Sequence, residues 1–388
     1  MLKCFVLLVS FYGDSYIKVP MMDASSETDL RLHFRTAQSN GLLLLAAGDI
    51  DYCLVVLQNG AIHVRLDLGS GDAQLTTPPG VVFNDLHWHA VRLARTEARV
   101  TLTVDGIYTT SAVTPGRFFE LNIDDDVYMG GPTGLDDTAR LFHHGVHHLR
   151  PFRGCAQNVT FNGVDVLRLA AAAAEERRTS NGGGYGVHAV TWDCSLEFAA
   201  TSDQPISFLG NASYVAFPSL AARHDGRMTF DLRTRSASAL VLYNSGAQFD
   251  SDFIAVEIDD GGRLKLRVNK GSGAVTLTSA TAVDDGAWHQ VEIFLDAVTA
   301  RLTVDGARGE ERMNFGSTRM LDVTTSLYVG GVGLPARSVA VQKELDSLRG
   351  DRAAAGSLIG CVQNFKVDGR PLGFREALVT CDVRPECV

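Results

Sequence analysis

The acidic residues whose spacing most suggests chemistry lie in the stretch VEIDDGG, residues 256–262. Because side chains alternate along a strand, Glu257 and Asp259 would share one face, as two carboxylates acting on a sugar bond must. Retaining glycoside hydrolysis needs two carboxyl groups about 5 to 5.5 Å apart. Gly261 stands where a third acid would be required, and residues 56–58, in the corresponding stretch of a repeat described below, include no acid. We therefore expect no enzyme and no catalytic residue, with Glu257 and Asp259 at a solvated strand end.

Four histidines in the stretch FHHGVHHLR could bind zinc if pairs spaced four residues apart met on a helix: His143, His144, His147 and His148. Gly145 interrupts a helix at their centre, and no cysteine or acid completes a catalytic set. We expect a solvated loop here.

A row of basic residues lies in GGRLKLRVNKG, where alternation places Arg263, Lys265 and Arg267 on one face of a strand. Cations about 6 to 7 Å apart could follow the sulfates of a glycosaminoglycan chain. Residues 61–65, the corresponding part of the repeat, contain one arginine. The alternative is a solvated sheet face with acids nearby, because the net charge of the whole chain is −10. That charge also argues against nucleic acid as a partner.

These residues lie within a sequence that is written twice. Most of the matching phrases are offset by 200 residues: TLTVDG with RLTVDG, HWHAV with AWHQV, and YMGG with YVGG. GCAQNVTFNG at 154–163 matches GCVQNFKVDG at 360–369. A period this long indicates two complete domains. We predict a leader over residues 1–10, one domain over 11–194 and a second over 195–388.

Both halves read almost entirely as strand. Short runs rich in Val, Leu, Ile and Thr alternate with polar residues and are separated by Asn-Gly, Asp-Gly and Gly-Gly turns. Alternation predicts sheets with one face on a core and one in water, which must close in pairs. The fold class is therefore all-β, two tandem antiparallel sandwiches. The alanine-rich stretch 166–179 is the exception, a predicted helix that would connect the domains.

The first half resembles the laminin G-like (LNS) domain in the order of its motifs. These motifs are SYIKVP, GLLLLAAG, DYCLVVLQNGAIHVRL, WHAVRL, LTVDG, VYMGG and FRGCAQNVTFNG. The pair is similar to the N-terminal region of the chondroitin sulfate proteoglycan 4 family. The resemblance implies jelly-roll β-sandwiches in an extracellular adhesion or receptor module, binding matrix or cell-surface proteins through rim loops. Two alternatives stay open: a glycan-binding, lectin-like sandwich, and a small-ligand carrier with a pocket between the sheets.

The resemblance also implies disulfides. Cys155 would pair with Cys194, and Cys361 with Cys387 in preference to Cys381, because Cys387 falls where the family's closing cysteine falls. Such pairs are typical of exported proteins. Cys53, on an apolar strand, is expected to be a buried free thiol.

Many domains of the resembled family place a calcium-binding aspartate where Asp51 and Asp252 stand. Asp49 and Asp250 lie two residues before them. Calcium takes six to eight oxygen ligands, so neighbouring rim loops would have to supply the rest. Calcium is therefore the possible cofactor, against an acidic hairpin loop as the alternative.

Two sequons, at Asn158 and Asn211, predict glycosylation, with Asn211, in the loop after SFLG, as the better acceptor. The first ten residues, MLKCFVLLVS, resemble a truncated secretory leader. No apolar stretch is long enough to cross a bilayer. We expect an extracellular or cell-surface location, with any membrane anchor outside this chain.

Overall fold

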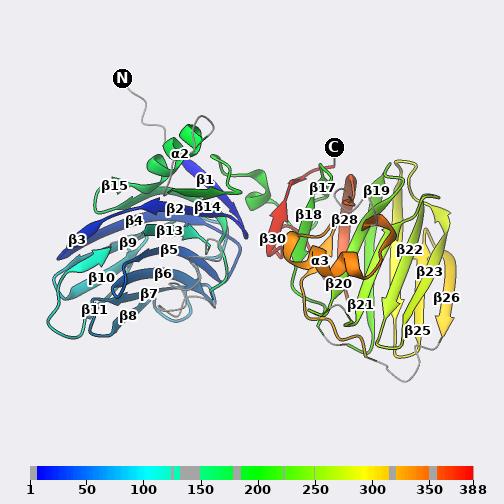
Figure 1. Ribbon diagram of the computed structural model, residues 1–388, viewed down its shortest axis with the longest axis horizontal. Coiled ribbons are helices and arrows are strands. Elements are labelled where there is room, and N and C mark those ends of the chain that lie inside the picture. Colours follow the sequence, from blue (N-terminus) through cyan, green and yellow to red (C-terminus); the bar gives the residue numbers. More distant parts are fainter. Residues whose placement is uncertain are drawn as a thin grey trace. The chain divides into compact units, whose positions relative to one another are not determined.

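The computed structural model describes residues 7–123, 126–131, 149–177, 185–221, 223–248, 250–313, 320–348 and 356–387. The chain divides into two compact units, Met1–Ala199 and Ala200–Val388. Each unit contains two large antiparallel sheets (Figure 1). The division falls five residues after the predicted boundary at Cys194.

In the first unit, β14 and β4 are central to one sheet and β13 and β5 to the other. The first sheet runs in the order β1 (Leu8–Tyr12), β14 (Arg153–Phe161), β4 (Glu27–Arg35), β9 (His89–Thr96), β10 (Arg99–Val104) and β11 (Tyr108–Val113), with β15 (Val164–Asp165) paired to β14. The second runs β16 (Gly186–His188), β2 (Tyr16–Pro20), β13 (Asp126–Gly130), β5 (Gly41–Ala47), β6 (Tyr52–Gln58), β7 (Ala61–Asp67) and β8 (Asp72–Thr76). Smaller elements are β3 (Asp23–Ser25), which pairs with β12 (Leu121–Ile123), the helix α2 (Val166–Arg177) and the 3-10 turn η1 (Leu196–Ala199).

The second unit repeats this arrangement. Its first sheet runs β26 (Ala307–Met313), β25 (Thr299–Val304), β24 (Trp288–Leu295), β19 (Gly226–Thr234), β28 (Gly360–Val367), β17 (Ile206–Phe208) and β31 (Val383–Pro385), with β29 (Arg370–Pro371) paired to β28. Its second runs β23 (Ala274–Ala282), β22 (Arg263–Asn269), β21 (Phe253–Ile258), β20 (Ala239–Ser245), β27 (Leu327–Val329), β18 (Tyr214–Phe217) and β30 (Val379–Cys381). The remaining elements are the helix α3 (Leu334–Gln342) and the 3-10 turn η2 (Asp346–Leu348).

The strand order confirms both the all-β fold and the internal duplication. The sequence β14-β4-β9-β10-β11 in the first unit corresponds to β28-β19-β24-β25-β26 in the second. Each pair of sheets encloses its own core, one rich in leucine, valine and phenylalanine from residues 9–170 and the other from residues 200–377. Each unit is therefore a jelly-roll sandwich that buries its own hydrophobic centre.

The central strands of the second sheets depart from the expected alternation. All seven residues of β5 and β20, and all six of β21, are buried, so apolar side chains occupy both faces. In the second unit the outward side chains, which include Tyr243 and Phe253, pack against residues of α3 and its extension, including Ala336, Ala340 and Leu348. Described residues of the segment that joins β27 to β28 therefore cover this face. The alternating pattern in the sequence predicts that it faces water, so this prediction is wrong for the central strands.

Two further expectations need correction. Residues 8–10 were assigned to a leader, but they begin β1, where Val9 is fully buried and pairs with Ala156 of β14. The helix predicted at 166–179 forms as α2, but it is not a connector. Its residues Val166, Leu167 and Ala170 are buried in the core of the first unit.

The duplicated phrases WH and TVDG meet in space. In the second unit His289 Nδ1 lies 2.7 Å from Asp305 Oδ2, and Nε2 lies 3.0 Å from Asp285 Oδ1. Asp305 has a φ of 51° at the turn after β25, and its other oxygen accepts a hydrogen bond from Gln290 N. His89 makes the equivalent contacts in the first unit. This shared network fixes the turn after β25, and the equivalent turn after β10, against the preceding strand of the same sheet, and it explains why both phrases occur in each copy.

We predict that this network makes the stability of the second unit depend on pH. Burial alone would lower the pKa of His289, but hydrogen bonds to Asp305 and Asp285 and their charges raise it above 6.5. A histidine with a raised folded-state pKa stabilises fully below its unfolded pKa, and this contribution is lost as the pH rises through the folded value. His289→Gln should reduce the free energy of unfolding by about 1 to 3 kcal/mol below pH 6, and by less above pH 8. Urea unfolding at several pH values measures it; a difference that does not vary with pH would contradict the prediction.

Candidate functional site

The two disulfides are the pairs that the resemblance implied, Cys155–Cys194 and Cys361–Cys387. Each ties a long central strand, β14 or β28, to the tail of its unit. Cys381 lies in β30, in the sheet opposite β28, which separates it from Cys361.

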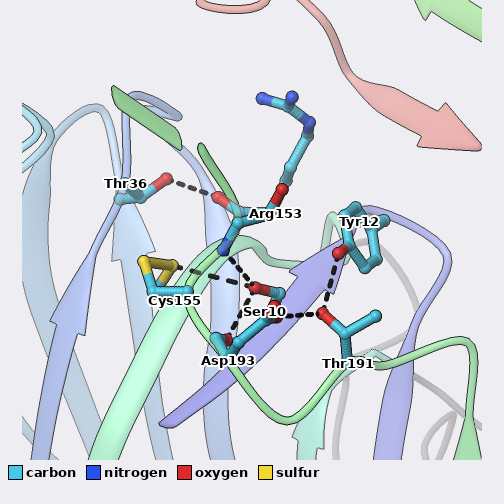
Figure 2. The surroundings of a disulfide bond; sticks show 9 residues. Ser10, Tyr12, Thr36, Arg153, Cys155, Thr191 and Asp193 are labelled. Atoms are coloured by element: carbon cyan, nitrogen blue, oxygen red, sulfur yellow. Dashed lines mark hydrogen bonds between the residues drawn. A yellow bond between two sulfur atoms is a disulfide. The ribbon is translucent and has the colours of Figure 1, made fainter. Parts of the chain in front are cut away.

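Figure 2 shows how the first bridge is enclosed. Ser10 Oγ lies 3.9 Å from Cys155 Sγ, donates a hydrogen bond to the carbonyl of Asp193 and accepts one from Ser195 N. Nearby, Arg153 forms a fully buried ion pair with Glu197 of η1, with 2.7 Å between Nη2 and Oε1. The disulfide and the ion pair together hold the tail of the first unit against its first sheet.

Cys53 is a buried free thiol, as the sequence predicts. Burial raises the pKa of this thiol to about 12.

The two sequon asparagines are both exposed. Asn158 occupies a β-bulge of β14 with a φ of 51°, and the equivalent Asn364 of β28 has a φ of 53°. Asparagine tolerates this left-handed conformation better than most residues, so the bulge explains why both copies have asparagine at this position. Asn364 is not part of a sequon. Asn211 has no such structural explanation. Glycosylation at both positions stays a prediction.

The first unit has a hollow of about 600 Å³ at its rim. It is built from the loop between β5 and β6, the turn after β7, and the segment that leads into β12. Its lining combines charged, polar and apolar side chains, including Asp51, Asn122, Ile50, Phe118, Phe119 and Arg117. We call this feature the rim hollow throughout.

Asp51 lies at the base of the rim hollow and is only 6% exposed. Its Oδ2 accepts hydrogen bonds from the backbone N of Asn122 at 2.9 Å and from the side-chain Nδ2 of Asn122 at 2.8 Å. In the described part of the chain, no donor lies within hydrogen-bond distance of the other oxygen, Oδ1. One oxygen of this nearly buried carboxylate therefore has no hydrogen-bond partner among the described residues.

The same place in the second unit is different. Asp252 Oδ2 accepts a hydrogen bond from Asp322 N at 2.8 Å, as Asp51 does from Asn122. Lys343, directly after α3, donates to the carbonyl of Ser251 at 2.6 Å. Burial, together with the negative charge of Asp322, raises the pKa of Asp252, while Lys343 and Lys270 act to lower it. The second unit thus brings lysines of its own to this rim.

The groups beside Asp51 and Asp252 bear on the calcium prediction in both units. Calcium needs six to eight oxygens, but Asp51 stands beside an amide nitrogen, and Asp252 stands near two ammonium groups. Within the part of the chain that the structure describes, no three His, Cys, Asp or Glu side chains gather closely enough to hold a metal. Calcium at Asp51 and Asp252 stays a prediction without support from these contacts. The four-histidine stretch lies outside the described residues.

The basic row Arg263, Lys265 and Arg267 does share one face of β22, as alternation predicted. Two of the three are already engaged: Lys265 Nζ lies 2.9 Å from Asp346 Oδ2, and Arg267 donates to the carbonyl of Glu344. Glycosaminoglycan binding by this row stays a prediction. A bound sulfate would have to compete with Asp346 and the Glu344 carbonyl for Lys265 and Arg267.

Glu257 is not at a solvated strand end. It is fully buried, and its Oε1 accepts hydrogen bonds from Ser347 N and Ser347 Oγ at 2.8 and 2.6 Å. Arg267 Nη1 lies 4.0 Å from its Oε2. The carboxylate fixes the covering segment on the sheet and is closed to a substrate.

A second hollow, of about 320 Å³, lies beside the disulfide of the second unit. Its lining includes three exposed arginines, Arg233, Arg235 and Arg384, and no acidic side chain. Arg233 of β19 lies opposite Cys361 on β28, and Arg384 of β31 lies opposite Ser207 on β17, so these two arginines come from strands of the same sheet, and Arg235 directly follows β19. We call this feature the arginine hollow.

Comparison with known proteins agrees with this architecture. The family description "Laminin G domain" matches residues 34–164 and 232–370. The chain belongs to the laminin G domain family. Domains of this family are extracellular adhesion and receptor modules. No helix in the described part of the chain is long and apolar enough to span a membrane.

Similar relatives extend over both laminin G units. Chondroitin sulfate proteoglycan 4 of Rattus norvegicus is 33% identical over 378 residues, which cover 97% of this chain and 15% of the relative. The Homo sapiens protein of that name is 32% identical over 382 residues, with the same coverage. Neurexin-3a of Danio rerio is 29% identical over 395 residues, 94% of this chain and 22% of the relative. The chain thus spans less than a quarter of the length of each.

Solved structures of laminin G pairs share the fold. The LG1-3 region of the laminin alpha2 chain has a TM-score of 0.63 at 19% identity, covering 98% of this chain and 66% of that one. Mouse laminin alpha1 domains LG4-5 have a TM-score of 0.57 at 23% identity, covering 98% and 94%.

Three features of the laminin G rims escaped sequence reasoning. Asn122 and Asp322 are separated by the same 200 residues as the YMGG and YVGG phrases, so extending the alignment would have found the partners of Asp51 and Asp252. The arginine hollow joins residues from four strands, β17, β19, β28 and β31. Lys343 comes from a segment whose path the sequence does not indicate. No local pattern marks either one.

Proposed function

We propose that this chain is an extracellular recognition module that binds matrix or cell-surface proteins through the rim hollow of its first laminin G unit. The observation that carries this proposal is the gathering of exposed apolar side chains there. Ile50 is 66% exposed, Phe118 63% and Phe119 42%. Large apolar side chains clustered around a concavity are typical of a surface that a partner covers. The family setting supports an extracellular or cell-surface location.

A binding role is supported over a catalytic one. Glu257, an acid considered for hydrolysis, is buried beneath Ser347. A carrier with a pocket between the sheets finds no support in the two hollows, because exposed residues line both. Whether the chain acts as the N-terminal part of a longer proteoglycan is an extension of the same proposal, supported by its similarity to chondroitin sulfate proteoglycan 4.

The double variant Phe118→Ala/Phe119→Ala tests the rim hollow. Removing two aromatic anchors from an interface typically costs 2 kcal/mol or more in total, so binding of the labelled chain to intact cells or immobilised matrix should weaken at least about tenfold. Ile107→Ala is the matched control, because Ile107 is 74% exposed at the turn between β10 and β11 and does not line the hollow. Equal binding by the wild type and the double variant would reject the rim hollow as the recognition surface.

Sulfated glycosaminoglycan is a second candidate ligand, and the arginine hollow favours it. Arginine guanidinium groups bind sulfate oxygens with two parallel hydrogen bonds, and three of them line one concavity without an acid. Neither Arg235 nor Arg384 is in an ion pair with a described residue. By contrast, Lys265 in the basic row is neutralised by Asp346. We infer that any glycosaminoglycan is held at the arginine hollow rather than by the basic row.

Heparin chromatography separates these two surfaces. Arg235→Ser/Arg384→Ser should elute at clearly lower salt than the wild type, because charge contacts to a polyanion are screened as ionic strength rises. Arg263→Ser, which removes the exposed end of the basic row, should change elution little. If only Arg263→Ser shifts elution, the basic row is the binding surface, and the inference is wrong.

A further inference from the structure

We propose that the rim hollow accepts a lysine or arginine side chain of a partner protein, with its charged end at Asp51. The inference rests on the proposed function and names the chemistry of the partner at that surface.

The groups that line the rim hollow converge at Gly69. A methyl group on Gly69 would lie 3.4 Å from Asp51 Oδ1, 3.8 Å from Ile50 Cγ2 and 4.0 Å from Phe118 Cδ2. The carboxylate oxygen without a partner, an aliphatic side chain and an aromatic ring therefore surround the same small space. Such a set suits a group that is cationic at its end and apolar along its length, which describes lysine and arginine.

The charge of the lining has the sign that this occupant needs. Asp51, Glu97 and Glu120 supply three carboxylates, against the single guanidinium of Arg117. Asp51 is the decisive group because it is 6% exposed, and a buried carboxylate with half its acceptor capacity unused gains most from an incoming donor. Glu97 and Glu120 are exposed and would act mainly by attracting a basic segment from a distance.

The second unit places a lysine of its own chain beside the duplicated loop, on a backbone carbonyl next to Asp252. Lys343 Nζ donates to the carbonyl of Ser251 and lies 5.3 Å from the centre of the Phe253 ring. Ser251 and Phe253 flank Asp252 as Ile50 and Tyr52 flank Asp51. In the second unit, the ammonium group of Lys343 therefore lies beside this loop and an aromatic ring. In the other copy, the rim hollow offers a carboxylate and aromatic rings to a lysine from outside.

The experiment uses the whole chain and a fluorescent peptide, acetyl-Gly-Lys-Gly-Lys-Gly-amide, with an analogue whose lysines are acetylated. We expect fluorescence anisotropy to detect binding of the charged peptide only. Asp51→Asn and Phe118→Ala should each weaken it by about tenfold, which corresponds to about 1.4 kcal/mol. Asp252→Asn, the duplicate position, should leave it unchanged. Asp51→Asn keeps an oxygen to accept from Asn122, so its thermal unfolding should stay close to that of the wild type.

Three results would overturn the inference. Equal binding by all variants would show that the peptide responds to the net charge alone. No binding of the charged peptide would show that the hollow does not take a basic side chain. A calcium-induced rise in Tm that Asp51→Asn abolishes would assign the carboxylate to a metal. If the charged peptide does not bind while Phe118→Ala/Phe119→Ala still weakens binding to cells, the proposed function stands. Only the inference that a basic side chain occupies the rim hollow is then wrong.

Discussion

The apolar outer face of strands β20 and β21 is the constraint on which the second unit depends. Both faces of these strands are buried, so the sheet needs a cover in addition to its partner sheet. The segment between β27 and β28 provides it with α3 and η2, and Glu257 fixes that segment through two hydrogen bonds to Ser347. A buried carboxylate oxygen is costly to leave unbonded, so the two hydrogen bonds to Oε1 hold the cover in one position. Oε2 has no hydrogen-bond partner among the described residues, and Arg267 lies 4.0 Å from it.

The cover also decides which charges of the second unit remain available. Its Asp346 neutralises Lys265, its Glu344 carbonyl binds Arg267, and its Lys343 reaches the loop that holds Asp252. A row of cations that looked free in the sequence is thereby engaged. The arginine hollow lies beside the Cys361–Cys387 disulfide instead, and no acidic side chain lines it.

Much of the fold could be predicted from the sequence because its signals are local. Alternating apolar residues, Asp-Gly turns and the 200-residue offset fix strands, hairpins and duplication, and both disulfides followed from the family pattern. The rest depends on contacts between distant segments. Glu257 looks solvated until Ser347 is placed over it, and Lys265 looks free until Asp346 approaches. Asp51 could be singled out from the sequence, whereas its single unused oxygen and the Phe118 ring beside it could not.

The covering segment sets the electrostatics of the second unit, and titration of the lysines in this unit tests this most directly. Hydrogen bonding to Asp346 raises the pKa of Lys265 above 10.5, while burial lowers that of Lys343 and that of Lys270. NMR of lysine 13Cε resonances across the alkaline range should therefore show Lys265 titrating above the ordinary lysine pKa of 10.5. Lys343 and Lys270 should titrate below it. If Lys265 and Lys343 titrate together near 10.5, like lysines on an open surface, the cover does not pack as described and the account is contradicted.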